Sequence, residues 1–415
     1  MGRKSISSSK STVRRHRLRV LQPESETDLI REMEEIGVDP AGITLMSPKG
    51  RSRAVRLEDL SPWQANLLKQ EMLSLGGEAA VHRGAIDCSA KSTAALLMGT
   101  EKHFRLLLEK LESQPPTMKK IGAEVREGLA EHGRRLFSLR LGSREVTLGE
   151  RTLIMGIVNV SPDSFYDGGQ HFSTRAAVEH GLELAGQGAD ILDIGGESTR
   201  PGAEPVGLEE EKRRVVPVIE ALASRCDAAI SVDTYKAEVA RDALAAGAVM
   251  VNDVSGLRFD PAMASVVSAA GAALIVMHMR GEPRTMQASP EYGNLMGEIV
   301  GELRCSVERA VEEGVDREQI LVDPGIGFGK GIEHNLLLLR RLSELRVLGR
   351  PIVVGASRKS FIGAISDLPV EERLEGTIAA SCLAVAAGAQ MVRVHDVRSV
   401  QRAVEVADAV RRSGA

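Results

Sequence analysis

The sequence predicts a (β/α)₈ barrel preceded by a smaller α/β domain. Three observations support this fold class. From Leu153 onward the chain contains eight short apolar runs, and nearly every run ends in a polar or charged residue. Each run is followed by a stretch of amphipathic sequence long enough for a helix, and the eight units fill roughly 265 residues, the size of one such barrel. Aromatic residues make up only 3% of the chain, which suits the aliphatic side-chain layers that fill a barrel.

The eight runs are the expected strands. In a barrel of parallel strands, the active site is built from the carboxyl ends of the strands and the loops that follow them. The polar residues that end the runs are therefore the first candidates for function. In chain order the runs and these residues are LIMGIV at Asn159, ILDIGG at Glu197, AISV at Asp233, VMV at Asn252 and Asp253, ALIVM at His278, ILV at Asp323, PIVVGAS at Arg358 and Lys359, and MVRV at His395.

Composition limits the class of protein. The 415 residues are enough for two or three domains, and 43% hydrophobic residues can form a large core. A net charge of −4 and a pI near 6.2 give no general attraction to nucleic acid or to an anionic membrane, so we expect neither partner. Four scattered cysteines without a CxxC pair suggest reduced thiols in the cytoplasm. No apolar run approaches the ~20 residues of a membrane span.

The N-terminal part is expected to comprise a disordered basic tail over residues 1–16 and a small α/β domain over 17–135. The tail is rich in Ser and Arg, which also loosely resembles a transit peptide. The domain contains no chemical motif, and its isolated His82, Cys88 and His103 favour structural roles. Strands are expected at 18–22, 42–46, 52–58, 78–84 and 93–99, and helices at 26–36 (closed by Gly37), 63–77 and 103–113.

The barrel domain is expected to cover residues 136–415. The Pro115-Pro116 pair marks a break, and residues 118–137 read as a charged helix that leads to the barrel. Residues 137–152 resemble a hairpin, which we expect to plug the N-terminal mouth of the barrel.

The first two loops of the barrel suggest anion binding. Residues 159–169 follow the first strand, and their small polar residues and glycines predict a mobile lid. In the second loop, Gly195-Gly196 lets the backbone approach a ligand closely, and Arg200 can bind a phosphate through two hydrogen bonds. Ordinary loops and a solvated arginine are the alternatives.

Strands three, four and six supply acids and an amide. Asp233, Asn252 and Asp253 can read the donor and acceptor edge of a heterocycle, because a carboxylate accepts two N–H bonds in one plane. Capping of helix N-termini could explain one of these residues but not all three. Asp323 opens the segment DPGIGFGK, whose glycine spacing matches neither a P-loop nor a Rossmann fingerprint. It reads as a carboxylate on a stiff turn, with Phe328 available for stacking.

The last two strands supply cations. Alternation places Arg393 and His395 on the same face of the eighth strand, and Lys359 follows the seventh. A phosphate site formed by the last two loops is a recurrent feature of these barrels. Together with Arg200 these residues predict a clamp for an oxyanion or pyrophosphate, the alternative being that they form salt bridges only.

These motifs together resemble the dihydropteroate synthase family, of the pterin-binding (β/α)₈ superfamily. Eight segments match in the order of the family over residues ~137–415. Ser161 stands where Thr is usual, and Tyr166 where a small polar residue is common; the N-terminal ~135 residues lie outside the resemblance. The matching segments are MGIVNVSPDSFYDGG, DIGGESTRPGA, SVDTYK, VNDVSG, VMHMRGEPRTMQ, DPGIGFGK, GASRKSFIG and VRVHDV.

The resemblance implies a transferase of folate biosynthesis. The family joins 6-hydroxymethyl-7,8-dihydropterin pyrophosphate to p-aminobenzoate, giving 7,8-dihydropteroate and pyrophosphate, and Mg²⁺ is the implied cofactor. An SN1-like loss of pyrophosphate is expected because the arylamine is already neutral at pH 7. The implied roles are catalysis for Asp233, Lys359, Arg393 and His395; pterin binding for Asp233, Asn252, Met277, Asp323 and Lys359; pyrophosphate binding for Asn159, Arg200, Arg393 and His395; and a metal contact for Asn159.

For p-aminobenzoate, the resemblance implies a carboxylate site near Ser360 and the helix that follows it. Phe165, Thr199 and Pro201 from the two lid loops would enclose the ring. The family also implies a homodimer. Two other functions stay open: a corrinoid-linked methyltransferase that binds methyltetrahydrofolate on the same barrel, and a non-catalytic pterin-binding or scaffolding protein.

Overall fold

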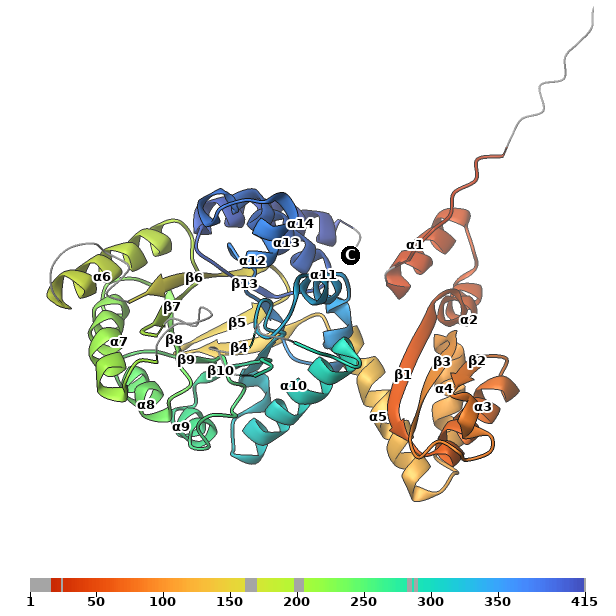
Figure 1. Cartoon of the computed structure of the whole chain (residues 1–415). Coiled ribbons are helices and arrows are strands. Elements are labelled where there is room, and N and C mark those ends of the chain that lie inside the picture. Colours follow the sequence, from red (N-terminus) through yellow and green to blue (C-terminus); the bar gives the residue numbers. More distant parts are fainter. Residues whose placement is uncertain are drawn as a thin grey trace, which may run out of the picture. The chain divides into compact units, whose positions relative to one another are not determined.

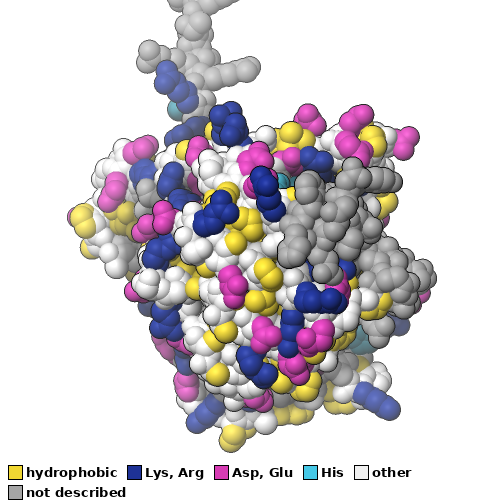
Figure 2. Space-filling view, turned by 90° about the vertical axis from the view of Figure 1, so that its left-hand side faces the viewer, with side chains coloured by type: hydrophobic (Ala, Val, Ile, Leu, Met, Phe, Trp, Pro, Cys, Tyr) yellow, Lys and Arg dark blue, Asp and Glu magenta, His cyan; other side chains and the backbone are white. Residues whose placement is uncertain are grey.

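The computed structural model describes residues 16–23, 25–160, 170–197, 205–281, 286 and 290–413, without the side chains of 170–173. The chain divides between Ser113 and Gln114 into two compact units. Within the described residues, no helix is both long and apolar enough to cross a membrane. The face drawn in Figure 2 has basic and acidic side chains interspersed, without a field of one sign.

The N-terminal unit is a three-stranded antiparallel sheet in the order β1-β3-β2, packed against helices. Ser61 and Gln64 form a capping box that starts α3, and Leu68 and Met72 of α3 are buried with Leu97 of β3 and Leu107 of α4. The elements are α1 (Glu26–Ile36), α2 (Pro40–Gly50), β1 (Ser52–Leu60), α3 (Pro62–Ser74), β2 (Glu78–Val81), η1 (Arg83–Ala85), β3 (Thr93–Thr100) and α4 (Glu101–Leu111).

Two expected strands of this unit are wrong. Residues 18–22 form no strand, and Leu18 and Val20 are each 84% exposed, because no neighbouring strand pairs with this segment. Residues 42–46 lie inside α2. The side chain of Asp39 accepts a hydrogen bond from the amide of Ala41 at 2.9 Å, and Pro40 occupies the first turn, so the helix start signal outweighs the apolar residues that suggested a strand.

The helix α5 (Pro116–Gly133) belongs to the barrel unit, which begins at Gln114. Met118, Ile121 and Val125 are buried on one face of α5, which packs against η4 (Leu342–Leu348). A helix that buries apolar residues against the barrel folds as part of it.

The second unit is the predicted (β/α)₈ barrel. All its neighbouring strands are parallel, in the order β11-β10-β9-β8-β7-β6-β13-β12. A parallel bridge between Val322 and Ile352 joins β11 to the segment that enters β12, and this contact closes the ring. The strands are β6 (Leu153–Asn159), β7 (Ile191–Gly195), β8 (Ala229–Asp233), β9 (Met250–Asp253), β10 (Ala273–Met277), β11 (Ile320–Asp323), β12 (Val353–Val354) and β13 (Met391–Val394).

Helices surround this ring of strands, as Figure 1 shows. Leu192, Val251 and Val392 belong to the large aliphatic core that fills the space between strands and helices. The surrounding elements are α6 (Gln170–Gly186), α7 (Leu208–Ala223), α8 (Ala237–Ala245), α9 (Met263–Ala270), α10 (Leu295–Glu312), η3 (Arg317–Gln319), α11 (Ile332–Arg340), α12 (Ser360–Ser366), η5 (Val370–Glu372), α13 (Leu374–Ala386) and α14 (Val397–Arg412).

The expected hairpin closes one end of the barrel. It consists of β4 (Phe137–Leu141) and β5 (Arg144–Leu148). Phe137, Leu139 and Leu141 alternate with exposed residues and pack, together with Leu148, on the first inward-facing residues of the strands, such as Met391. The amino ends of the strands are therefore covered by apolar side chains, and any site for a polar ligand lies at the opposite, carboxyl end.

Candidate active site

Seven of the predicted site residues come together at the carboxyl ends of the strands. Pairing between strands puts Gly195 beside Asp233, Asp233 beside Asn252, and Met277 beside Asp323, so these ends lie at one level of the barrel. Each of these residues is the last or next-to-last residue of its strand and follows an apolar run that is buried in the barrel wall. The residues that the structure brings to this mouth are Asp233, Asn252, Met277, Asp323, Lys359, Arg393 and His395.

Arg393 lies at the centre of the site and is held by two carboxylates. Its Nε donates to Asp193 Oδ2 and its Nη2 to Asp233 Oδ2, both at 2.6 Å. Asn252 Nδ2 donates to the same Asp193 oxygen at 2.9 Å. Burial alone lowers the pKa of Arg393, but the two carboxylates more than offset this and raise it above its usual value. The guanidinium is thus a fixed positive charge beneath the mouth.

Asp193 joins the candidate site through its contacts with Arg393 and Asn252, and it is not among the residues predicted from the sequence. Its side chain is fully buried in the middle of β7, and its Oδ1 has no hydrogen-bond partner among the described residues. The sequence does contain a signal for it. An acid inside the apolar run ILDIGG must be paired in the folded protein, because an isolated buried carboxylate is too costly.

Asp233 and Asp253 have different tasks, although both were candidates for helix capping. Asp253 accepts hydrogen bonds from the amides of Ser255 and Leu257, both at 2.8 Å, so it shapes the backbone of its own loop. Asp233 instead pairs with Arg393. Burial raises the pKa of Asp233, and Arg393 opposes this shift and favours the charged form. Asp253 caps no helix, because the next helix, α9, begins only at Met263, and the capping alternative therefore explains neither residue.

Asp323 lies at the start of a tightly held turn. Its Oδ1 accepts the amide of Gly325 at 2.7 Å, and burial raises the pKa of its carboxyl group while Lys359 lowers it. Lys359 donates to the carbonyl of Ile326 and stands 4.6 Å from the centre of the Phe328 ring. Burial lowers the pKa of Lys359 to about 8. The carboxylate and the ammonium thus lie on one side of the mouth.

An apolar wall lines the same side. Met277 is 4% exposed and belongs to a small cluster with Val254, Met279 and Met286, against which Phe328 packs. A flat aromatic ring can lie on such thioether and aromatic surfaces while its edge meets polar groups.

His395 is held by the preceding strand. Ser357 Oγ lies 2.9 Å from His395 Nδ1, and the amide of His395 donates to the same hydroxyl at 3.2 Å. Arg358 is paired with Asp396 through two hydrogen bonds of 2.9 and 2.6 Å. Salt bridges of this kind, which were the alternative to a clamp, are thus formed by Arg358 and also by Arg393, whereas Lys359 and His395 lie at the mouth.

Four predicted residues, Phe165, Thr199, Arg200 and Pro201, lie outside the described residues. The two described ends of the second loop are both bound by one side chain, that of Lys236, which was not predicted from the sequence. Lys236 Nζ binds Glu197 Oε2 at 2.5 Å and the carbonyl of Val206 at 2.8 Å, and it also pairs with the buried Glu211. The remaining candidates, Asn159 and Ser360, are exposed at the end of β6 and at the first residue of α12.

Comparison with known proteins gives consistent results. Residues 155–395 match the family described as "Pterin binding enzyme". A dihydropteroate synthase from Synechocystis is 50% identical over 66% of this chain and 94% of its own length. A dihydropteroate synthase structure from Xanthomonas albilineans with 4-aminobenzoic acid has 45% identity and a TM-score of 0.63, and the match covers 67% of this chain and 99% of that one.

A third relative reaches further along the chain. A probable bifunctional folylpolyglutamate synthase/dihydropteroate synthase from Halobacterium salinarum is 43% identical over 91% of this chain, and this chain spans 45% of its length. That match is longer than the barrel unit alone, so it extends into the N-terminal unit. With the carboxylates, the amide and the cations of the barrel mouth in place, the chain belongs to the pterin-binding enzyme family, among its dihydropteroate synthases.

Proposed function

We propose that this chain joins 6-hydroxymethyl-7,8-dihydropterin pyrophosphate to p-aminobenzoate, forming 7,8-dihydropteroate and pyrophosphate. One observation supports the proposal more strongly than the others. A guanidinium, Arg393, is fixed at 2.6 Å from each of two carboxylates at the mouth of the barrel. Such a group can stabilise a departing anion while the carboxylates stabilise the cation left behind.

The pterin ring fits between the apolar wall and the polar strand ends. The carboxylate of Asp323 would accept two hydrogen bonds from the amidine-like edge of the ring, and Asn252 and Lys359 would contact other polar atoms of it. Met277 and Phe328 supply the surfaces for stacking. Each of these side chains is held by a described contact, so little ordering is needed when the substrate binds.

The reaction begins with the departure of pyrophosphate. The C–O bond to the pterin methylene carbon breaks, and its electron pair leaves with pyrophosphate. Arg393 and His395, with Arg200 from the second loop, would bind the charge that develops on the leaving oxygen. The cation that remains is delocalised over the pterin, and Asp233 lies where it can stabilise that charge.

Mg²⁺ fits this site only as a partner of the substrate. Within the described residues, no group of three or more His, Cys, Asp or Glu side chains could hold a metal ion. Magnesium is commonly bound by substrate phosphates, waters and one or two protein oxygens. Asn159 at the end of β6 would supply the protein oxygen, and the ion would neutralise part of the pyrophosphate charge.

The second substrate completes the reaction. The neutral amine of p-aminobenzoate forms the new C–N bond with its lone pair and then loses a proton to solvent or pyrophosphate. Its carboxylate would lie near Ser360 at the start of α12, and Phe165, Thr199 and Pro201 would enclose the ring.

We also propose a homodimer in the cytoplasm. Leu336 and Leu337 of α11, Ile365 of α12 and Leu383 of α13 are exposed, and α11 packs beside both of the other helices. Apolar surface of this kind is typical of a subunit interface. The four cysteines are all free thiols, as expected of a protein in a reducing compartment. Sedimentation velocity would give a single species of twice the chain mass.

The proposed activity can be tested directly by pyrophosphate release. Purified protein is given the pterin pyrophosphate and Mg²⁺, with or without p-aminobenzoate. Release that depends on p-aminobenzoate, and falls in an Arg393→Ala variant and after chelation of Mg²⁺, supports the synthase. Pterin binding without release would instead favour the methyltransferase or the non-catalytic alternative, neither of which requires a pyrophosphate clamp.

A further inference from the structure

Lys330 is a buried basic side chain that the proposed mechanism does not use. It ends the segment DPGIGFGK, and only 2% of the residue is exposed. Its Nζ lies 3.0 Å from the carbonyl oxygen of Gly325, 3.1 Å from that of Phe328 and 3.3 Å from that of His278, and 2.8 Å from His278 Nδ1. Three of these neighbours are carbonyl oxygens, to which the amino group donates, and burial lowers the pKa of Lys330 well below its usual value.

The hydrogen bond to Lys330 determines the state of His278. With Lys330 as the donor, Nδ1 accepts and the ring hydrogen is on Nε2, which faces Glu302 Oε2 at 3.4 Å. Burial lowers the pKa of His278 to about 4, so the ring is neutral at pH 7. The imidazole thus lies between the amino group of Lys330 and a carboxylate on α10.

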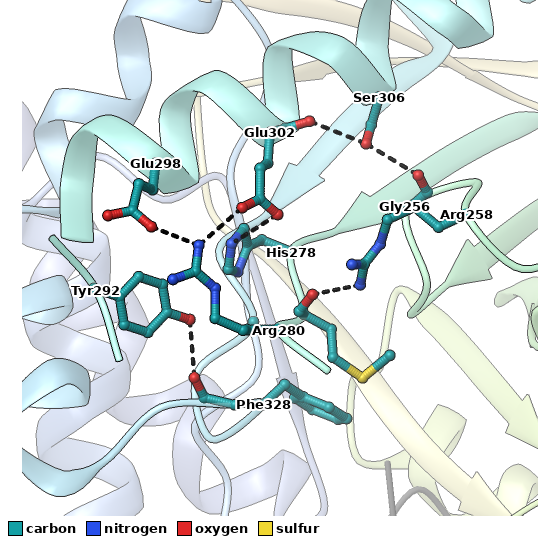
Figure 3. Close-up of polar contacts among 12 residues, drawn as sticks. Gly256, Arg258, His278, Arg280, Tyr292, Glu298, Glu302, Ser306 and Phe328 are labelled. Carbon is teal, nitrogen blue, oxygen red and sulfur yellow. Dashed lines mark hydrogen bonds and ion pairs between the residues drawn. The ribbon is translucent and has the colours of Figure 1, made fainter. Parts of the chain in front are cut away.

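These contacts continue into a ring of interactions, of which Figure 3 shows the part that contains His278, Glu302 and Arg280. Glu302 Oε1 accepts from Arg280 Nη2 at 3.1 Å, and the Arg280 guanidinium lies 4.0 Å from the centre of the Tyr292 ring. The Tyr292 hydroxyl donates to the carbonyl of Gly329 at 2.8 Å. Because Gly329 directly precedes Lys330, the contacts lead back to their starting point. The ring therefore ties the end of β10 and helix α10 to the turn that carries Asp323.

That turn needs such support. Gly325, Gly327 and Gly329 have φ values of 67°, 82° and 61°, a backbone conformation that glycine adopts easily but does not enforce. The side chains of Asp323 and Phe328 project from this turn. Lys330 binds the carbonyls of Gly325 and Phe328 from within, and so holds the two ends of the glycine segment together.

We propose that Lys330 is a positioning residue for the pterin ring. It fixes the turn so that the Asp323 carboxylate and the Phe328 ring are ready before substrate arrives, and the ring of contacts through His278 and Glu302 holds Lys330 in turn. This role rests on the proposed function, because it names the pterin as the ligand that the turn receives. It assigns Lys330 no contact with substrate.

The test separates positioning from mere stability by means of a matched control. Arg350 is also a basic residue at 2% exposure, and it is bound to the carbonyl of Arg317 and to Glu318, at the amino end of β11 and β12. Lys330→Met and Arg350→Met each remove one buried basic group from the same barrel unit. For both variants and the unsubstituted chain we would measure the melting temperature, the Kd of the pterin pyrophosphate by calorimetry, and the KM for p-aminobenzoate at saturating pterin.

Both variants are expected to melt at lower temperature. Lys330→Met should raise the Kd of the pterin pyrophosphate by about 10- to 100-fold, since a displacement of about 1 Å in a site has effects of this size, and should leave the KM for p-aminobenzoate unchanged. Arg350→Met should change the Kd by less than about twofold, because it is remote from the turn. An unchanged Kd in Lys330→Met would overturn the proposal.

A milder variant covers the case in which Lys330→Met does not fold. Tyr292→Phe removes only the hydroxyl that binds Gly329, and should raise the same Kd by about three- to tenfold; no change in a folded Tyr292→Phe variant would then count against the ring of contacts. Absence of pterin binding by the unsubstituted chain would refute the proposed function itself, and the two failures are thereby distinguished.

Discussion

Asp193 offers the sharpest test of the site, because its role follows from the structure alone. The variant Asp193→Asn preserves the shape of the side chain and removes its charge. Asp193 Oδ2 accepts from both Arg393 Nε at 2.6 Å and Asn252 Nδ2 at 2.9 Å. The amide oxygen can replace this acceptor only if the new NH₂ group takes the place of Oδ1, for which no partner exists among the described residues.

The expected loss of stability follows from these contacts. Removing one partner of a buried ion pair costs about 3 to 5 kcal/mol, and a hydrogen bond to a charged group contributes about 1.5 to 3 kcal/mol. Arg393 keeps its second carboxylate, Asp233, so its charge is not left alone. The unpartnered NH₂ group adds a cost of about 1 to 3 kcal/mol. We therefore expect the free energy of unfolding to fall by about 3 to 5 kcal/mol.

The effect on catalysis should exceed any effect of lost stability. With one of its two anchors weakened, Arg393 no longer points reproducibly at the leaving oxygen. Loss of one donor to a developing oxyanion costs about 10²- to 10³-fold in kcat, and here the donor is loosened but not removed. A 10- to 100-fold fall in kcat is expected, equivalent to about 1.4 to 2.7 kcal/mol in the barrier.

The assay compares this variant with Asp190→Asn. Asp190 immediately precedes the same strand at the opposite end of the barrel and pairs with Arg151 at 2.8 and 2.5 Å. Both variants should lower the midpoint of urea unfolding, but only Asp193→Asn should lower kcat at saturating substrates. If Asp193→Asn keeps full kcat while both variants lose stability, Asp193 is a structural counterion only and the reasoning about Arg393 is refuted.

Three further predictions concern other parts of the barrel unit. The pKa of Lys359 is about 8 and its protonated form binds anionic substrate, so kcat/KM should be level below pH 8 and fall about tenfold per pH unit above it. In Lys359→Arg this alkaline fall should disappear. A fall at the same pH in that variant would assign it to another group. Leu139→Ala in the hairpin should reduce the free energy of unfolding by about 2 to 5 kcal/mol in denaturant titrations while kcat is kept, and a loss of kcat would mean that the plug shapes the distant mouth. Ser357→Ala removes the hydroxyl at 2.9 Å from His395 Nδ1 and should lower kcat by about three- to tenfold with an unchanged Kd for the pterin substrate; an unaltered kcat would show that His395 needs no such support.

The sequence predicted the barrel well because its strands are defined by burial. Runs such as ALIVM and ILV are apolar on both faces, as central parallel strands require, and each one ends where a polar residue reaches the mouth. Sequence position alone therefore predicted Asp233, Asn252 and Asp323. In the N-terminal unit the apolar runs are shorter and half-exposed, and Asp39-Pro40 turned one of them into a helix.

The contacts between site residues could not be predicted in the same way. That Arg393 pairs with Asp193 across 200 positions of sequence depends on β13 and β7 both flanking β6 in the closed ring. Asp253 binds amides of its own loop whereas Asp233 pairs with Arg393, and this difference depends on backbone geometry after the strand, which two similar motifs do not reveal. In the sequence Lys330 is only the last residue of a glycine-rich segment, and its contacts in the structure show that it binds that segment from within.

These contacts suggest why the site contains paired charges and not a free cationic clamp. A free arginine at the mouth would attract pyrophosphate strongly in substrate and product alike, and such uniform binding does not increase the rate of the chemical step. Asp193 and Asp233 pair with Arg393 before substrate binds and hold it in place. In the proposed reaction, positive charge would appear on the pterin and negative charge on pyrophosphate when the C–O bond breaks. The carboxylates would then interact with the former and the guanidinium with the latter, so the fixed charges would stabilise the separated ions more than the substrate that precedes them.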